Sequence, residues 1–305
     1  MSGMLEGKVV VVTGAGRGVG RGAALMAANA GASVVVNDLG VSPGGEDTGE
    51  APAASVVREI RDAGGQAVAN TEDVGGWKSA SAIIECAIDT FGRVDAVVNN
   101  AGILQDAIFH KMEPESFERV LQVNLAGPFY LSRAAAPHFK DQGAGAYVHM
   151  TSSAALIGNM GQANYMASKM GLVGLSTSIS IDMQKFGVTS NCIAPFAWTR
   201  MVGTIPVNSP EQQARVEGLK KLDPNKVGTL AVALISDAGR AAANGQVFGV
   251  RNNEIYLFSK NRPIQIMHDG DGWTCDAIID RVMPAFEPNF LPPAMSRDIF
   301  SWDPV

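Results

Sequence analysis

A tyrosine and a lysine at helical spacing are the first residues in this sequence that could do chemistry. Tyr165 and Lys169 stand four positions apart in the segment NYMASK. On a helix they share one face, about 6 Å apart along the axis. A lysine charge beside a phenol lowers the pKa of the phenol, which is what proton transfer at working pH requires. Such pairs are common by chance on helix surfaces, so this one needs support from other residues.

Two more polar residues could complete a catalytic group. Ser152 ends the segment AYVHMTS, and its hydroxyl could hold a substrate oxygen and share charge as an alkoxide forms. Its neighbours Thr151 and Ser153 compete for that role. Asn124 is a polar residue in the apolar segment VLQVNLAG. It is either a buried helix position with a local hydrogen bond or part of a proton relay behind Lys169.

A glycine cluster near the N-terminus predicts a nucleotide site. The apolar run VVVV is followed by TGAGRGVG and a helical stretch. Glycine is needed where the turn is tight and the backbone approaches a pyrophosphate, and the following helix directs its N–H groups at the phosphates. The strand, the glycines and the helix occur in the required order. The residues predicted to bind the cofactor here are Gly14, Arg17, Gly18, Val19 and Gly20.

An acid at the end of the second predicted strand favours NAD. Asp38 closes the run VVVND, where a carboxylate accepts both ribose hydroxyls of NAD and repels the 2′-phosphate of NADP. Arg17 favours the phosphate, but an unpaired carboxylate against a phosphate costs more than a mobile arginine gains. We therefore predict NAD as the cofactor. Residues after the third and fourth strands are predicted to reach the adenine edge and line the rest of the cofactor: Asp73, Val74, Asn100, Ala101 and Gly102.

Strand-like and helical segments alternate along the chain. Most of the short β-branched runs are apolar on both faces, as parallel strands buried between helix layers are. This alternation predicts a doubly wound α/β fold with a parallel sheet. The predicted strands are Val9–Thr13, Ser33–Asn37, Ala67–Asn70, Ala96–Asn99, Ala146–Thr151, Thr189–Ile193 and Gln246–Val250.

The segments outside this alternation suggest one domain with an extension. We expect a dinucleotide-binding domain over residues 1–250, in which residues 200–226 cover the substrate. Residues 251–305 are expected to form a hairpin, a short helix and a packing arm. The RNNE sequence between two apolar runs predicts the hairpin turn, because asparagine tolerates positive φ.

Composition excludes several classes of function. The formal net charge is −6, so nucleic acid is a poor candidate partner. Three widely spaced cysteines suggest reduced thiols in the cytoplasm rather than a disulfide framework. Four histidines without ligand spacing predict no metal site. Neither a signal peptide nor a membrane span is expected.

Taken together, TGAGRGVG, NNAG, Asn124, Ser152 and YMASK resemble the short-chain dehydrogenase/reductase family, in order over roughly residues 5–250. The resemblance implies a Rossmann-type sheet of about seven strands in the order 3-2-1-4-5-6-7. It implies Tyr165 as the proton donor or acceptor, and Ser152 as the group that positions substrate. Lys169 would lower the pKa of the tyrosine and bind the nicotinamide ribose, with Tyr165 also beside the cofactor. Asn124 would hold a relay water.

The loop after the sixth predicted strand also resembles the family. Pro195 and Thr199 stand where the loop that fixes the nicotinamide carboxamide is expected. Phe196 occupies a position that is usually glycine in the family, which puts the local geometry of that loop in question.

Other segments, such as EIRDAGGQAVAN, are similar to the (3R)-hydroxyacyl-CoA dehydrogenase part of peroxisomal multifunctional enzyme type 2 (17β-hydroxysteroid dehydrogenase type 4-like) and its bacterial relatives. We therefore predict a small-molecule substrate, with 3-hydroxyacyl-CoA and 3-ketoacyl-CoA first. A hydroxysteroid or another bulky secondary alcohol is the alternative. A non-catalytic nucleotide-sensing scaffold is disfavoured, because such proteins typically lose the tyrosine or the lysine. Family members pair through their long central helices, here 108–140 and 162–186, which implies a homodimer or homotetramer.

A cluster of basic residues offers a test of the thioester prediction. Coenzyme A carries phosphate groups, so an acidic protein needs a local cationic patch to bind it. The patch would come from Arg200, Arg215, Lys220, Lys221 and Lys226. These residues are equally consistent with ordinary solvated charges. A steroid would instead need an apolar pocket, for which the candidates are Met160, Phe196, Trp198, Met201 and Val202.

Overall fold

One mostly parallel sheet organises the chain. The computed structural model describes residues 3–49, 51–198, 209, 213, 216–217 and 219–302. In this part of the chain an eight-stranded sheet has the order β3-β2-β1-β4-β5-β6-β7-β8. The predicted order of the first seven strands is therefore confirmed, and an eighth strand is added. The strands are β1 Val9–Thr13, β2 Ser33–Asn37, β3 Gln66–Asn70, β4 Ala96–Asn99, β5 Gly145–Met150, β6 Val188–Phe196, β7 Val247–Arg251 and β8 Glu254–Leu257.

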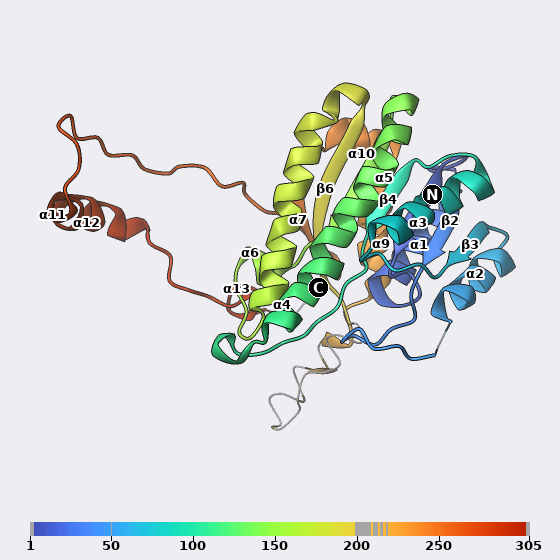
Figure 1. Cartoon of the computed structure of the whole chain (residues 1–305), viewed down its shortest axis with the longest axis horizontal. Helices are drawn as coiled ribbons and strands as arrows, with labels where there is room; N and C mark the ends of the chain where they lie inside the picture. The colour runs from blue at the N-terminus through green and yellow to red at the C-terminus, as the bar shows by residue number, and fades with distance from the viewer. Residues whose placement is uncertain are drawn as a thin grey trace.

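Helices cover both faces of this sheet (Figure 1). The side chains of β1 alternate between two cores: Val10 and Val12 pack with α1, α2 and α9, while Val9 and Val11 pack with α3, α4 and α5. A strand that is buried on both sides must be apolar at every position, which explains the unbroken valine run. The helices are α1 Gly18–Asn29, α2 Pro52–Asp62, α3 Trp77–Phe91, α4 Pro114–Leu121, α5 Gly127–Gln142, α6 Ser153–Leu156, α7 Ala163–Asp182, α9 Pro224–Ile235, α10 Asp237–Ala242, α11 Cys275–Ala277, α12 Met283–Phe286 and α13 Ser296–Ile299.

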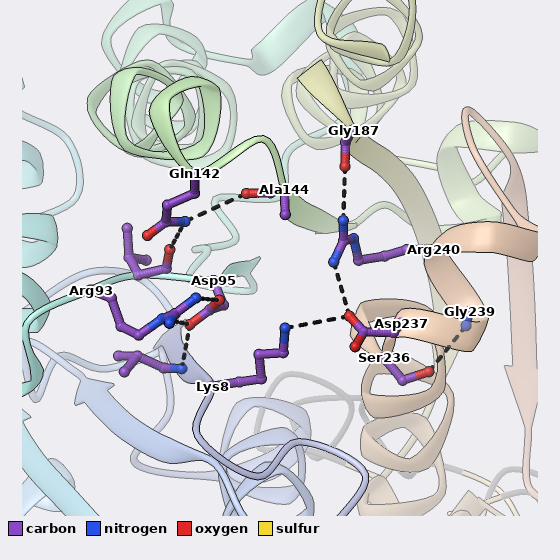
Figure 2. Close-up of polar contacts among 12 residues, drawn as sticks. Lys8, Arg93, Asp95, Gln142, Ala144, Gly187, Ser236, Asp237, Gly239 and Arg240 are labelled. Atoms are coloured by element: carbon purple, nitrogen blue, oxygen red, sulfur yellow. Dashed lines mark hydrogen bonds and ion pairs between the residues drawn. The ribbon is translucent and has the colours of Figure 1, made fainter. Parts of the chain in front are cut away.

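Polar side chains hold the amino ends of the parallel strands together (Figure 2). The carboxylate of Asp95, just before β4, accepts a hydrogen bond of 2.9 Å from the main-chain N–H of Val9 at the start of β1. It also accepts two from the guanidinium of Arg93, at 2.8 and 2.7 Å. Nearby, Arg240 binds the main-chain oxygen of Gly187 and the carboxylate of Asp237. This network fixes the end of the sheet opposite the strand termini that carry function in α/β folds.

The chain beyond β7 leaves the sheet and comes back. β8 pairs antiparallel with β7 through a turn in which Asn252 has φ +56°, as the RNNE sequence predicts. The next segment extends away from the body and carries α11 and α12 at its far end (Figure 1). Ile264, Ile266 and Leu291 in this segment are 81%, 89% and 91% exposed. Residues 294–302 then return to the body beside α6, where they contact residues 153–158.

Candidate active site

A single cavity collects most of the predicted site residues. Its volume is about 950 Å³, and it lies at the carboxyl ends of β1, β2, β4, β5 and β6. This is the edge of an open α/β sheet where ligands bind. Gly20 and Asn124 do not line it, and Thr199 lies outside the described residues. The predicted residues that line the cavity are Gly14, Arg17, Gly18, Val19, Asp38, Asp73, Val74, Asn100, Ala101, Gly102, Ser152, Tyr165, Lys169 and Pro195.

Backbone geometry explains the glycines of the first loop. Gly14 has φ +59°, in the left-handed region that favours glycine. At Gly20 a Cβ atom would lie 2.2 Å from the main-chain oxygen of Gly14, so no side chain fits between the loop and α1. The loop therefore folds tightly enough to direct the first N–H groups of α1 into the cavity. That geometry suits an anionic ligand such as a pyrophosphate.

A threonine that the sequence analysis did not single out joins two loops of the site. The hydroxyl oxygen of Thr13 accepts hydrogen bonds of 3.1 Å from the main-chain N–H groups of Asn100 and Ala101. In return the amide of Asn100 donates to the main-chain oxygens of Thr13, at 2.9 Å, and Gly14, at 3.0 Å. The glycine loop and the NNAG segment are thus held as one unit. The signal available was the position of Thr13, a hydroxyl directly before the first glycine.

Asp38 faces the cavity with its carboxylate already oriented. One oxygen accepts a 2.8 Å hydrogen bond from the N–H of Gly16, and the other accepts one of the same length from Gly40. A carboxylate oxygen has capacity for a second donor, so both oxygens remain able to accept hydroxyls. Asp73 is oriented in the same way, by a 2.9 Å hydrogen bond from the N–H of Gly75.

Ser152, Tyr165 and Lys169 meet at the other end of the cavity. Ser152 stands at the N-cap of α6, where its hydroxyl accepts a hydrogen bond from the N–H of Ala154. The Tyr165 side chain hydrogen-bonds with Ser152. The ammonium of Lys169 donates 2.8 Å to the main-chain oxygen of Met150 and lies 5.7 Å from the centre of the Tyr165 ring. The three residues therefore form one cluster, on α7 and after β5.

The electrostatics of this cluster correct one expectation. We expected the charge of Lys169 to lower the pKa of the phenol. Burial instead raises the pKa of Tyr165. The hydrogen bond with Ser152 lowers it, and the carboxylate of Asp106 raises it further. Burial also lowers the pKa of Lys169 to about 8. Desolvation disfavours the charged form of both groups and is the largest cause of both shifts.

Asn124 lies behind the cavity, fully buried. It sits in the π-helical segment Gln122–Ala126, which joins α4 to α5. Its side-chain oxygen accepts 2.9 Å from the N–H of Ile103, and its amide donates 3.0 Å to the oxygen of the same residue. Asn124 is therefore a buried position whose side chain is bonded to the main chain of Ile103. Its amide group keeps a second donor and its oxygen a second lone pair, so its part in a proton relay stays a prediction.

Polar residues near Tyr165 were not singled out from the sequence. Asp106 and Gln162 line the cavity, as does Asn159. The amide of Gln162 donates 2.8 Å to the carboxylate of Asp106 and accepts 2.8 Å from Asn159. Burial raises the pKa of Asp106, although the hydrogen bond from Gln162 opposes that shift. The signal was present in the sequence, since the NNAG motif continues into ILQD.

The expected cationic patch does not reach the cavity in the described part of the chain. Lys220 binds the carboxylate of Glu217 at 2.7 Å, and Lys226 binds the side-chain oxygen of Asn253. Neither they nor Lys221 line the cavity. Arg200 and Arg215 lie outside the described residues. In the described part of the chain, Lys220 and Lys226 therefore contact other surface side chains rather than the cavity.

Only one of the apolar candidates for a substrate pocket lines the cavity in the described part of the chain. Trp198 lines the cavity. Met160 is 68% exposed, and Phe196 packs against Phe300 with ring centres 4.7 Å apart. Met201 and Val202 lie outside the described residues.

Neither a metal-binding cluster nor a membrane-spanning helix is found among the described residues. No group of three or more histidine, cysteine, aspartate or glutamate side chains there is arranged to hold a metal ion. No helix among them is long and apolar enough to cross a bilayer.

Comparison with known proteins agrees with the geometry. Residues 8–206 match the short chain dehydrogenase family. The chain is 42% identical over 80% of its length to mouse peroxisomal multifunctional enzyme type 2, of which it spans 32%. It is 36% identical to hydroxyacyl-CoA dehydrogenase ChsB1 of Mycobacterium tuberculosis, over 88% of this chain and 85% of that protein.

A solved structure extends the likeness to the fold. The crystal structure of a short chain dehydrogenase from Mycobacterium avium superposes with a TM-score of 0.82 at 35% identity, covering 96% of this chain and 99% of that one. The resemblance predicted from TGAGRGVG, NNAG and YMASK is confirmed by these matches. The chain belongs to the short-chain dehydrogenase/reductase family and is an oxidoreductase that acts on CH–OH groups.

Proposed function

We propose that this protein is an NAD(H)-dependent dehydrogenase that interconverts a secondary alcohol and a ketone, with Tyr165 as its acid–base group. The observation that carries the proposal is one cavity of about 950 Å³ lined by Ser152, Tyr165, Lys169 and the glycine loop. A phenol at one end and a dinucleotide cradle at the other are what alcohol oxidation requires. A bound nicotinamide supplies the hydride acceptor, and the chain's residues handle the proton.

Each residue of the cluster has a distinct part in this proposal. Tyr165 accepts the hydroxyl proton in oxidation and returns it in reduction. Ser152 hydrogen-bonds with the phenol and positions the substrate oxygen, where it stabilises developing charge. Lys169 holds its ammonium against the main chain of β5 and also binds the nicotinamide ribose. Asn124 supports this arrangement by fixing the backbone of Ile103, directly after the NNAG segment.

Two features of the site support NAD as the cofactor. The close approach of Gly20 to Gly14 leaves backbone rather than side chain facing a pyrophosphate. Asp38, with both oxygens already oriented, is placed to accept ribose hydroxyls and to repel a 2′-phosphate. We therefore propose NAD rather than NADP. Pro195 lines the same cavity, and in our proposal it forms, with Thr199, the loop that holds the nicotinamide.

For the substrate, we propose a 3-hydroxyacyl-CoA and its 3-ketoacyl-CoA product. The support is the likeness to ChsB1, which bears the name hydroxyacyl-CoA dehydrogenase, over most of both chains. The likeness to multifunctional enzyme type 2 points the same way. A hydroxysteroid remains the alternative, because the same cluster would serve it and only the pocket would differ.

A substrate panel with a matched variant tests both levels of this proposal. Purified enzyme is assayed with NAD and NADP on 3-hydroxyacyl-CoA thioesters, hydroxysteroids and simple secondary alcohols. Tyr165→Phe keeps the ring and removes the ionisable oxygen, so turnover should fall roughly 10²- to 10⁴-fold while NADH still binds. Near-full turnover by this variant would refute the catalytic assignment. Activity on steroids with none on any thioester would refute the substrate alone.

The protein's surroundings follow as further proposals. Phe129 on α5 and Met170 and Ile181 on α7 are exposed apolar side chains, 47%, 41% and 69% accessible. They support pairing of two or four copies through these helices. Light scattering on Ile181→Asp tests this, and we expect the assembly to be lost.

The three cysteines are free of disulfides in the structure, which supports a cytoplasmic location. No nucleic-acid or membrane partner is proposed.

A further inference from the structure

The last described stretch of the chain contacts both loops that flank the catalytic cluster. We call residues 294–302 the C-terminal brace. It contains α13 and lies beside α6 (Figure 1). One of the two loops, residues 153–162, follows β5 and Ser152. The other, residues 195–198, ends β6 and follows it.

The brace holds the first loop by direct hydrogen bonds. The hydroxyl of Ser296 lies 2.7 Å from the hydroxyl of Ser153, the neighbour of Ser152. The N–H of Ser296 donates 2.9 Å to the main-chain oxygen of Gly158. Gly158 has φ +155°, and a Cβ there would lie 2.2 Å from the main-chain oxygen of Ala294. The loop and the brace are therefore in backbone-to-backbone contact at this point.

The brace holds the second loop through an aromatic cluster. The ring of Phe300 packs edge-on against Phe196, with centres 4.7 Å apart. It also packs against Tyr256 of β8, with centres 5.1 Å apart. Phe196 occupies the position where the family usually has glycine, and its ring makes the contact with Phe300 that a glycine could not make. Its neighbours Pro195 and Ala197 line the cavity.

The end of the brace is anchored on the sheet. The indole N–H of Trp302 donates 2.7 Å to the carboxylate of Glu254. The guanidinium of Arg251 binds the main-chain oxygen of Trp302 and lies 5.3 Å from the centre of its ring. Arg251 and Glu254 flank the β7–β8 turn and pair with each other at 3.3 Å. The anchor is thus part of the rigid sheet rather than of a loop.

Both braced loops shape the cavity around the reacting groups. The first contributes Ala154, Asn159 and Gln162, and the second contributes Pro195, Ala197 and Trp198. Loops are the least stable parts of a fold, and a displacement of about 1 Å near reacting groups costs roughly 10²-fold in rate. We propose that the C-terminal brace sets the position of both loops, with Ser296 and Phe300 as positioning residues for the substrate end of the site. This inference rests on the proposed dehydrogenase function.

Hydrogen exchange tests the brace without any substrate. Phe300→Ala should speed amide exchange in residues 153–162 and 195–198 by roughly tenfold, and Ser296→Ala should do so in the first loop alone. The matched controls are Ile299→Ala and Ser301→Ala, two exposed neighbours on the same segment. Exchange in β1, β4 and β5 should stay at the wild-type rate. Unchanged exchange in both loops of Phe300→Ala would overturn the proposal.

Kinetics separate positioning from general stability. Phe300→Ala and a chain ending at Pro293 should raise KM for the alcohol or lower kcat, by roughly tenfold. The Kd for ADP-ribose, measured by calorimetry, should change little, because this ligand lacks the nicotinamide that the Pro195 loop would hold and its proposed partners, the glycine loop and Asp38, lie away from the brace. Phe300→Tyr keeps the ring and should restore wild-type values. A truncated chain with unchanged kinetics would contradict the inference, and if that chain fails to fold, the single substitutions decide. If the wild-type enzyme is inactive but the variants still show faster exchange in the two loops, the result counts against the proposed function and not against the brace.

Discussion

Gln162, three residues before Tyr165 in the sequence, donates a 2.8 Å hydrogen bond to the carboxylate of Asp106. The bond crosses from the NNAGILQD segment to the start of α7, and both residues line the cavity beside the phenol. It fixes a carboxylate near the group that exchanges the substrate proton. The charge of that carboxylate raises the pKa of Tyr165 in addition to the effect of burial.

Removing the charge of Asp106 should move the pH dependence of catalysis to lower pH. Alcohol oxidation requires the phenolate form of Tyr165, so kcat/KM rises as pH increases through the phenol pKa. In Asp106→Asn the phenolate loses a neighbouring negative charge, its pKa falls, and the rise occurs at lower pH. The measurement is a pH–rate profile for oxidation. Asp182→Asn, a similar change near the end of α7, is the control. A profile shifted upward would show that Asp106 stabilises the phenolate indirectly.

Neutralising Asp38 should relax the choice between NAD and NADP. The carboxylate accepts hydrogen bonds from the N–H groups of Gly16 and Gly40. Asp38→Asn keeps an acceptor oxygen for one of the two and removes the repulsion of a 2′-phosphate. The ratio of kcat/KM for NAD over NADP should therefore fall by at least about tenfold, the equivalent of 1.4 kcal/mol. Asp73→Asn is the matched control, because Asp73 lines the cavity at the proposed adenine edge. A wild-type enzyme that already prefers NADP would contradict the assignment.

The sequence was a good guide wherever one physical rule acts alone. The strands β1, β2 and β4 were predicted to the residue, because runs such as VVVV are buried on both faces and end at glycine or asparagine. Features that depend on distant partners were not predictable. The role of Thr13 emerges only when β1 and β4 lie side by side, and the Asp106–Gln162 pair joins segments 56 residues apart. The pKa of Tyr165 was predicted in the wrong direction, because spacing on a helix says nothing about burial.

Removing the Asp95 carboxylate should destabilise the fold but leave catalysis at the active site unchanged. Asp95→Ala leaves the N–H of Val9 without its 2.9 Å acceptor, and an unsatisfied buried donor costs roughly 1–3 kcal/mol. Tm should fall by about 2–4 °C for each kcal/mol lost. Because Asp95 is at the opposite end of the sheet from the cavity, kcat at low temperature should stay near the wild-type value. The control is Asp237→Ala in the same network (Figure 2), whose side chain is 72% exposed. A loss of kcat in Asp95→Ala with no fall in Tm would contradict this reading.

His149 should make the protein lose stability in mild acid. The ring is fully buried on β5, with Nδ1 3.2 Å from the amide nitrogen of Asn99, which donates to it. Burial, with a smaller effect from the charge of Lys169, lowers the pKa of His149 to about 3. An unfolded histidine has a pKa of about 6.5. Between these two values the unfolded chain binds a proton that the folded chain excludes. The stability is therefore complete above pH 6.5 and is lost as the pH falls toward 3, by up to roughly 1.4 kcal/mol per pH unit from this residue alone.

Urea unfolding at pH 7, 6 and 5 measures that slope directly. His149→Gln removes the titrating ring but keeps a polar group beside Asn99. In the wild type, the rings of His149 and Tyr147 stack with their centres 6.1 Å apart. The variant loses this packing, so it should be less stable than the wild type at pH 7. Its free energy of unfolding should nevertheless fall less steeply with acid, and the two curves should converge toward pH 5. The control is His268→Gln, at an exposed position in the extension, which should run parallel to the wild type. Parallel curves for His149→Gln would mean that the buried ring is protonated in the folded state or that carboxylates dominate the acid response.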